Sequence, residues 1–226
     1  MPRPLIPHRA SVILDRAEEL FCANGYDRTS IAEISARSGI AKGAVYREFP
    51  SKGAVLDALL VRNSQRMLAE VRAGVEGSSG PVGLAAAYRF GIRALLRDPL
   101  ARAFLQADTD VLGSYIRDRT DDRYAARVAW VTRYLDELQR AGAVRGDVDP
   151  ADVSIALSAL TVGVFSIGPL VGGLSDDRLE PVLDVITDMV ESGLDRTAAA
   201  RDDGATRRAQ LHLLDRVQEQ LGSPAE

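Results

Sequence analysis

The chain has 226 residues, of which 46% are apolar and 27% charged, as in an ordinary folded protein of one or two domains. The net charge is −4, but residues 1–60 hold eight basic and seven acidic residues, whereas the remainder holds 20 and 25. The single cysteine, Cys22, excludes an internal disulfide bond, and no long apolar run begins the chain, so we expect a cytoplasmic protein without a signal peptide.

Helical periodicity dominates the sequence, and strand signals are weak throughout. The first predicted helix covers residues 10–24 and ends at Gly25. It carries one apolar stripe, made of Ile13, Leu14, Ala17, Leu20 and Phe21. Cys22 lies near that stripe, and we expect a small residue at the edge of the core rather than a reactive thiol.

Two short helices follow. Ser30 and Glu33 have the spacing of a capping box, in which each side chain satisfies a backbone donor near the other. This second helix ends at Gly39, and a third begins near Lys42. Two short helices joined by a tight turn that contains glycine are typical of a helix-turn-helix motif.

The third helix is unusual in the face that it exposes. On a helical wheel, Val45 and Phe49 fall together and form the buried face. The opposite face carries Gly43, Ala44 and Arg47. Small residues permit close approach to a surface, and arginine is the commonest side chain for bidentate contact with guanine in the major groove. An ordinary solvated helix face is the alternative interpretation.

Other polar groups near this helix are placed to contact phosphates, which position a protein on DNA without reading sequence. They are the side chains of Lys42, Tyr46 and Lys52 and the backbone amides near Thr29 and Ser30, at the start of the second helix.

The rest of the chain also has helical patterning, which predicts an all-α fold. A helix is expected over 51–73, a connecting loop over 74–83, and further helices over about 82–97, 99–116, 121–141, 150–172 and 177–197. A polar tail that follows contains a short amphipathic segment.

Residues 153–174 form 22 positions without a charge, long enough to span a bilayer. Acidic residues flank the segment on both sides, and no tryptophan or tyrosine stands at either end, which argues against a span. A helix apolar on most sides must be covered on most sides. We therefore expect this segment and the apolar helix over 178–194 to form an interface with a second subunit; a membrane-anchored helical regulator is the alternative.

No catalytic set is evident. The only histidines, His8 and His212, lie in the two terminal segments, and one cysteine with two histidines cannot form a zinc cluster. We expect neither an enzyme nor a cofactor or metal site.

Residues 13–60, "ILDRAEELFCANGYDRTSIAEISARSGIAKGAVYREFPSKGAVLDALL", resemble the DNA-binding domain of the tetracycline-repressor (TetR) family of bacterial transcriptional regulators. The resemblance implies a DNA-binding domain over 1–50, a ligand-binding and dimerisation domain over 51–200, and a polar tail over 201–226. It implies a homodimer that represses transcription until a small molecule releases it from its double-stranded DNA operator. The residues implied to contact DNA are Thr29, Ser30, Lys42, Gly43, Ala44, Tyr46, Arg47 and Lys52.

This sequence departs from the family pattern at two positions. Ala41 replaces the usual serine or threonine at the cap of the recognition helix, and Glu48 places an acidic group near the DNA. Both bear on which operator is bound. Before the first helix, Arg3, His8 and Arg9 form a short arm that either reaches DNA or is disordered.

The effector pocket is much harder to locate, because aromatic residues make up only 5% of the chain. The candidate contacts are Met67, Phe104, Trp130 and Tyr134. Met67 stands on the helix that connects the two domains, so a ligand that favours one position of that helix would change the spacing of the recognition helices. A helical adaptor that has lost DNA binding is a further alternative.

Overall fold

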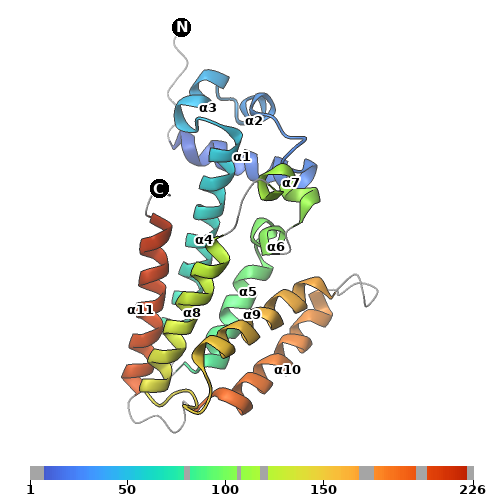
Figure 1. Ribbon diagram of the computed structural model, residues 1–226. Coiled ribbons are helices and arrows are strands. Elements are labelled where there is room, and N and C mark those ends of the chain that lie inside the picture. The colour runs from blue at the N-terminus through green and yellow to red at the C-terminus, as the bar shows by residue number, and fades with distance from the viewer. Residues whose placement is uncertain are drawn as a thin grey trace. The chain divides into compact units, whose positions relative to one another are not determined.

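The computed structural model describes residues 8–78, 82–105, 108–117, 122–167, 176–196 and 203–222 (Figure 1). Within these ranges the chain is helical apart from loops and one isolated bridge, between Val144 and Asp195, which confirms the all-α prediction. In chain order the helices are α1 (Arg9–Asn24), α2 (Ile31–Ser38), α3 (Lys42–Glu48), α4 (Lys52–Gly77), α5 (Leu84–Leu96), α6 (Pro99–Leu105), α7 (Thr109–Arg117), α8 (Asp122–Arg140), α9 (Pro150–Ser166), α10 (Asp176–Leu194) and α11 (Asp203–Gly222).

The helices divide between two compact units. The first unit holds residues 1–64 and 98–120, and the second holds residues 65–97 and 121–226. The sequence placed the boundary at residue 50 and set residues 201–226 apart as a tail. The contacts instead divide the chain within α4, bring α6 and α7 into the first unit, and include α11 in the second.

The core of the first unit is built on the apolar stripe of α1. Ile13, Ala17 and Phe21 are fully buried, as the periodicity predicted. The same cluster includes Ile34 of α2, Val45 of α3, and Val55, Leu56 and Leu59 of α4. Each such side chain contributes about 1.5–3 kcal/mol when it is removed from water, so these contacts fix the orientation of α2 and α3.

The single helix predicted over 99–116 is wrong, since α6 ends at Leu105 and α7 begins at Thr109. The physical reason is Asp108, whose Oδ1 accepts hydrogen bonds from the backbone N–H groups of Asp110 (2.8 Å) and Val111 (3.2 Å). An aspartate that satisfies free amides in this way begins a new helix. Within α7, Gly113 has a φ of 53° and interrupts the regular helix.

The residues between α1 and α2 are tied to α7. The Tyr26 N–H donates to the carbonyl of Val111 (2.8 Å). The Asp27 carboxylate accepts from both the backbone N–H (3.0 Å) and the hydroxyl (2.6 Å) of Ser114. The segment that leads into the helix-turn-helix is therefore held by hydrogen bonds as well as by its core.

The second unit has its own core, to which α5, α8, α9, α10 and α11 contribute. Helix α8 packs against α9 and α11, and α5 packs against α10. Its most buried side chains include Leu135 and Leu138 of α8 and Leu183 of α10. The expected short tail helix is the 20-residue α11, which buries Thr206, Ala209, Gln210 and Leu214.

The boundaries of α4 and α9 can be compared with the predicted helix boundaries. Helix α4 continues to Gly77 rather than ending near residue 73, so part of the predicted loop over 74–83 is helical. Helix α9 begins as predicted, with Pro150 in its first turn and the Asp149 carboxylate accepting from the Ala151 N–H (2.8 Å).

The described part of the chain contains no helix long and apolar enough to cross a membrane. Of the uncharged segment over 153–174, residues 168–174 lie outside the described ranges.

Candidate DNA-binding surface and effector pocket

The start of α2 is capped as the sequence predicted. The Glu33 N–H donates to the Ser30 hydroxyl (3.2 Å), and the Ser30 N–H donates to the Glu33 carboxylate (2.7 Å). The Ser30 hydroxyl and N–H also hold the pKa of Glu33 below its usual value. This capping box fixes the first turn of α2, and Ser30 itself is exposed.

The turn between α2 and α3 depends on Gly39. Its φ of 68° lies in the left-handed region that glycine adopts without steric cost, and its N–H donates to carbonyls in the last turn of α2. The Ser35 hydroxyl donates to the carbonyl of Ile40 (2.6 Å) and ties the turn back to α2. Helices α2 and α3 with this turn form a helix-turn-helix.

Helix α3 exposes four of the residues predicted to contact DNA, Lys42, Gly43, Tyr46 and Arg47. Tyr46 is 45% exposed, which is unusual for a large aromatic side chain, and the Lys42 ammonium lies 5.9 Å from its ring centroid. Nothing lies within 4 Å of the position that a Cβ on Gly43 would occupy. The exposed face is therefore open, small at Gly43 and basic at both ends.

Ala44 is placed differently from the helical wheel. It is only 9% exposed and belongs to the core cluster of the first unit. The wheel treated the helix in isolation, whereas neighbouring helices cover the Ala44 side of α3. Beside it, Val45 is fully buried as predicted.

Thr29 and Lys52 serve the interior of the first unit. Thr29 is 1% exposed, and its hydroxyl donates to the carbonyl of Gly25 (2.9 Å). The Lys52 ammonium donates to the carbonyl of Tyr26 (2.7 Å) and lies 4.1 Å from the centroid of the Tyr26 ring. Burial is the main reason that the pKa of Lys52 lies below its usual value.

The acidic residue at the end of α3 has a basic partner. Arg9, the first residue of α1, lies 3.5 Å from the Glu48 carboxylate. Arg9 thus reduces the repulsion that Glu48 would exert on a phosphate.

Of the predicted arm, Arg3 lies outside the described residues, and His8 precedes α1 with a positive φ of 55°. Ala41 provides no side-chain hydrogen bond at the start of α3.

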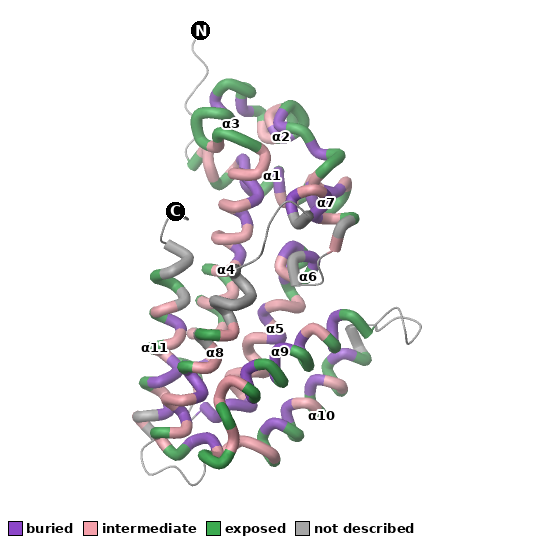
Figure 2. The backbone as a smooth tube through the Cα atoms, viewed as in Figure 1, coloured by how far each residue is buried: buried purple, intermediate pink, exposed green. Residues whose placement is uncertain are grey.

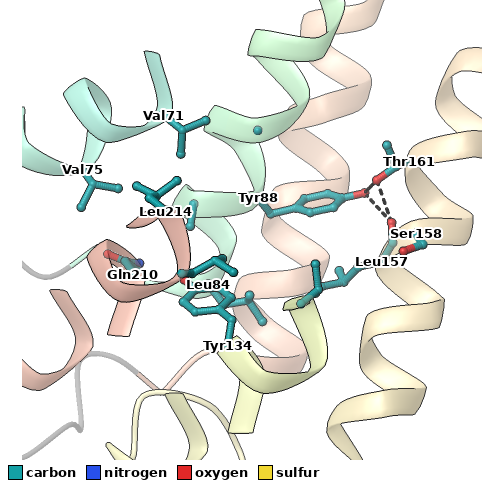
Figure 3. A pocket seen from close by; sticks show the side chains of 14 residues that line it. Val71, Val75, Leu84, Tyr88, Tyr134, Leu157, Ser158, Thr161, Gln210 and Leu214 are labelled. Atoms are coloured by element: carbon teal, nitrogen blue, oxygen red, sulfur yellow. Dashed lines mark hydrogen bonds between the residues drawn. The ribbon is translucent and has the colours of Figure 1, made fainter. Parts of the chain in front are cut away.

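The second unit contains a pocket of about 200 Å³ (Figure 3). Its wall comes from α4, α5, α8, α9 and α11, through residues such as Val71, Tyr88, Tyr134, Thr161 and Gln210. Most of the remaining lining is aliphatic, and none of the described residues that line the pocket is charged.

Of the four residues expected to contact an effector, Tyr134 lines this pocket. Met67 is half-buried on α4 and does not belong to the lining. Phe104 stands on α6 in the first unit, and the side chains of Phe104 and Trp130 lie outside the described part of the chain. The sequence analysis missed Tyr88, although it is an aromatic residue, and Gln210, which it assigned to the polar tail.

The polar groups of the pocket lie at two ends. At one end the Tyr88 hydroxyl donates to the carbonyl of Leu157 (3.2 Å) or pairs with the Thr161 hydroxyl (3.1 Å), as the dashed lines in Figure 3 show. At the other end Tyr134 stands beside Gln210. Burial is the main reason that the pKa of Tyr134 lies far above its usual value, so its phenol stays protonated.

An exposed apolar surface runs along α9 and α10. Its large members are Ile155, Leu160, Ile167, Val185 and Met189, each between 37% and 63% exposed. Figure 2 shows exposed positions recurring along both helices. On α9 the exposed positions from Ile155 to Ser166 carry no charge. Large exposed apolar surfaces are typical of protein interfaces.

Little points to catalysis or metal binding. The described residues include no group of three or more histidine, cysteine or acidic side chains able to hold a metal ion. Cys22 is exposed rather than part of the core edge, and desolvation of its thiol by neighbouring groups, with added repulsion from Glu18 and Asp98, raises the pKa of the thiol to about 11. The thiolate of Cys22 is therefore scarce at neutral pH.

The fold and the capped helix-turn-helix define a DNA-binding regulatory protein. Residues 13–59 match the family model described as "Bacterial regulatory proteins, tetR family". The HTH-type transcriptional repressor Rv1474c of Mycobacterium tuberculosis is 30% identical over 194 residues, covering 84% of this chain and 98% of that protein. The chain belongs to the TetR family and is an HTH-type transcriptional regulator.

One further relative is similar in sequence, and one solved structure is similar in fold. The HTH-type transcriptional regulator UidR of Escherichia coli is 26% identical over 160 residues, covering 68% of this chain and 78% of UidR. The solved structure of the fatty acid degradation regulator FadR from Bacillus halodurans has the same fold, with a TM-score of 0.65 at 16% identity over 84% of this chain and 98% of that one. Rv1474c and UidR are named as transcriptional regulators, not enzymes, in agreement with the expectation from the sequence.

Proposed function

We propose that the protein is a cytoplasmic repressor that binds its operator as a homodimer and is released when a small molecule occupies the pocket of the second unit. The observation that carries the DNA-binding part is the exposed face of α3. There Lys42, Gly43, Tyr46 and Arg47 stand free of the core on a helix held by Gly39 and the capping box.

Each exposed group has a distinct role in this proposal. Gly43 lets the backbone of α3 approach the floor of the major groove, and Arg47 donates to a guanine edge. Lys42, Tyr46 and the exposed Ser30 contact phosphates on either side. Thr29, Ala44 and Lys52 act indirectly, because their side chains are committed to the interior of the first unit.

The homodimer is supported by the apolar surface of α9 and α10. Ile155 and Met189 are 57% and 63% exposed in the single chain, and a second copy of the same two helices would remove both from water. A twofold interface of this kind presents two α3 helices to half-sites about 34–36 Å apart, one turn of DNA.

Release follows from a shift between two conformations. Helix α4 provides Val71 and Val75 to the pocket wall and Leu56 and Leu59 to the core of the first unit. A ligand that binds one arrangement of α4 more tightly than another moves the population toward it, by no more than that difference in affinity.

Binding to DNA from upstream of the protein's own gene tests the DNA-binding proposal. Affinity should exceed that for an unrelated duplex and fall steeply between about 50 and 200 mM salt, because phosphate contacts release counterions. Arg47→Ala should weaken operator binding by about 1–3 kcal/mol and reduce discrimination between the duplexes. Arg140→Ala, which removes an exposed arginine from α8 in the second unit, is the matched control.

Equal affinity of Arg47→Ala and the parent for the operator duplex would exclude α3 as the reading helix. If the parent protein binds no duplex at low salt, the protein is instead an adaptor without DNA binding.

Sedimentation tests the dimer. The parent chain should sediment as a dimer at micromolar concentration, and the double variant Ile155→Glu, Met189→Glu as a monomer with weakened operator binding. His212→Glu, an exposed position on α11, should stay dimeric. A dimeric double variant would show that the subunits meet elsewhere.

A further inference from the structure

The described wall of the pocket in the second unit carries no charge, and charged side chains next to it in the sequence pair with each other. Arg72 and Asp215 each follow a lining residue, on α4 and α11, and they form an ion pair. Arg89 of α5, also next to a lining residue, pairs with Asp184 of α10. A charged ligand would therefore find no counter-charge on the described wall.

Three hydroxyl groups gather on the α9 side of the pocket, those of Tyr88, Ser158 and Thr161 (Figure 3). The Thr161 hydroxyl donates to the carbonyl of Leu157 (2.8 Å). The Tyr88 hydroxyl lies 3.2 Å from the same carbonyl oxygen and 3.1 Å from the Thr161 hydroxyl. Tyr88 and Thr161 are therefore satisfied by each other and by the backbone of α9.

Ser158 differs from its neighbours on α9. A serine or threonine within a helix can donate to the carbonyl four residues earlier, as Thr161 does. Ser154, one turn before Ser158, donates instead to the carbonyl of Val128 (3.1 Å). The Ser158 hydroxyl has no such partner among the described residues, although Ser158 is only 8% exposed. It can thus donate to, or accept from, a molecule in the pocket.

A nearly buried hydroxyl without a partner carries a desolvation penalty, which a ligand removes when it supplies a hydrogen bond. At the opposite end of the pocket the Tyr134 hydroxyl faces the Gln210 amide. Hydrogen bonding between them opposes the rise that burial causes in the pKa of Tyr134. Because those two groups are engaged with each other, Ser158 is the better point of attachment for a ligand.

We propose that the effector is an uncharged, mainly apolar molecule with one neutral hydrogen-bonding group, which the hydroxyl of Ser158 binds. The apolar part lies against the aliphatic wall, which includes Val71, Val75 and Leu157. Calling this molecule the effector rests on the function proposed above, but its binding to the pocket does not.

Charge and size narrow the class of ligand. A carboxylate or an ammonium group is costly to bury against a wall that offers it no partner. A cavity of about 150 Å³ holds benzene, so the pocket of about 200 Å³ suits a molecule of roughly seven to ten non-hydrogen atoms.

Calorimetry of the full chain without DNA tests the proposal with probes that share one shape. Benzyl alcohol, ethylbenzene and benzylammonium differ only in the group on the methylene carbon, which is a hydroxyl, a methyl or an ammonium group. Benzyl alcohol and ethylbenzene should both bind to the parent chain. Benzylammonium should bind at least about tenfold more weakly than benzyl alcohol, because its charge would lose its hydration.

Ser158→Ala separates the hydrogen bond from the apolar contact. It should weaken the binding of benzyl alcohol about three- to tenfold and leave that of ethylbenzene within about twofold of the parent, because only the alcohol loses a bond. Its melting temperature should not fall, since the Ser158 hydroxyl has no internal bond to lose. Ser154→Ala is the matched control: it loses the bond to Val128 and should melt at a lower temperature while binding both probes as the parent does.

Three results would each overturn the proposal: no binding of benzyl alcohol or ethylbenzene, binding of benzylammonium as tight as that of benzyl alcohol, or an equal effect of Ser158→Ala on the two neutral probes. A lower melting temperature of Ser158→Ala would also overturn it, because it would show an internal partner for the hydroxyl. Absence of operator binding would instead refute the proposed function and leave these measurements standing.

Discussion

The ammonium group of Lys52 donates a hydrogen bond of 2.7 Å to the carbonyl oxygen of Tyr26, 26 residues earlier in the chain. A second, longer bond of 3.4 Å reaches the carbonyl of Asp27. One side chain at the start of α4 thus holds the segment that leads into α2. The family resemblance implied that Lys52 grips phosphate, whereas the geometry gives it a clear task inside the protein.

Replacing Lys52 separates these two roles. Lys52→Met keeps the aliphatic stem but removes the charged hydrogen bonds and the contact with the Tyr26 ring, and should cost about 1–2 kcal/mol of unfolding free energy. Chemical denaturation monitors this loss. The salt dependence of DNA binding should stay as in the parent, since a side chain without phosphate contact releases no counterion.

A different result for Lys52→Met would contradict the structural role of Lys52: unchanged stability, with the slope of log affinity against log salt concentration reduced by about one unit. That reduction is expected when one phosphate contact is lost. Lys42→Met supplies the comparison, because Lys42 is exposed and should lower the slope without affecting stability.

Gly43 offers a test of the small face of α3. An added Cβ would meet no atom within 4 Å, so Gly43→Ala should stabilise the helix by up to about 1 kcal/mol. The same methyl group would keep α3 from the groove floor, and operator affinity should fall about tenfold or more. Thermal melting and DNA titration of the same sample give both numbers.

Gly25→Ala is the structural counterpart of Gly43→Ala. Gly25 has a φ of 82°, and an added Cβ would overlap the carbonyl oxygen of Asp110. That variant should lose about 2 kcal/mol or more of stability through strain and steric overlap.

Unchanged operator binding by Gly43→Ala would contradict the proposal that α3 approaches the DNA closely at this residue.

Because Glu48 pairs with Arg9, removing the negative charge of Glu48 should strengthen DNA binding. Glu48→Gln removes a negative charge from the end of α3 and frees Arg9 for a phosphate, so affinity at about 50 mM salt should rise several-fold. Glu76→Gln makes the same charge change in the second unit. Lower affinity in Glu48→Gln would indicate instead that Glu48 accepts a hydrogen bond from a cytosine.

Local signals in the sequence predicted much of the first unit. The capping box of Ser30 and Glu33, the stop at Gly39 and the stripe of α1 are each set by residues close in sequence, and each is confirmed. Burial of Ala44 and Thr29 could not be predicted this way, because it depends on neighbouring helices. The break before α7 had a local signal in Asp108, a helix-capping residue that the longer periodicity concealed.

The pocket was much less predictable, because its wall is assembled from five helices spread over residues 71–214. A search for aromatic residues found Tyr134, but most of the wall consists of aliphatic and small residues that look like ordinary core. Gln210 gave no signal at all. A glutamine in a polar segment looks solvent-exposed until the packing of α11 on α8 buries it.

The capping box also predicts how acid affects the helix-turn-helix. Hydrogen bonds from Ser30 lower the pKa of Glu33 in the folded state, so this carboxylate adds stability above its unfolded pKa of about 4.3, and that contribution is lost as the pH falls through the folded value. Melting the parent and Glu33→Gln between pH 6 and 3 measures the effect. Glu33→Gln should melt below the parent at pH 6, and the gap should close toward pH 3.

Glu19→Gln, on α1, removes one negative charge from a carboxylate that caps no helix and is the matched control for the change of charge. A constant gap between Glu33→Gln and the parent across the whole range would mean that the protonated carboxyl holds α2 as well as the carboxylate does. The start of α2 would then depend on the hydroxyl of Ser30 alone, and Ser30→Ala, at a cost of about 1 kcal/mol, would account for the whole cap.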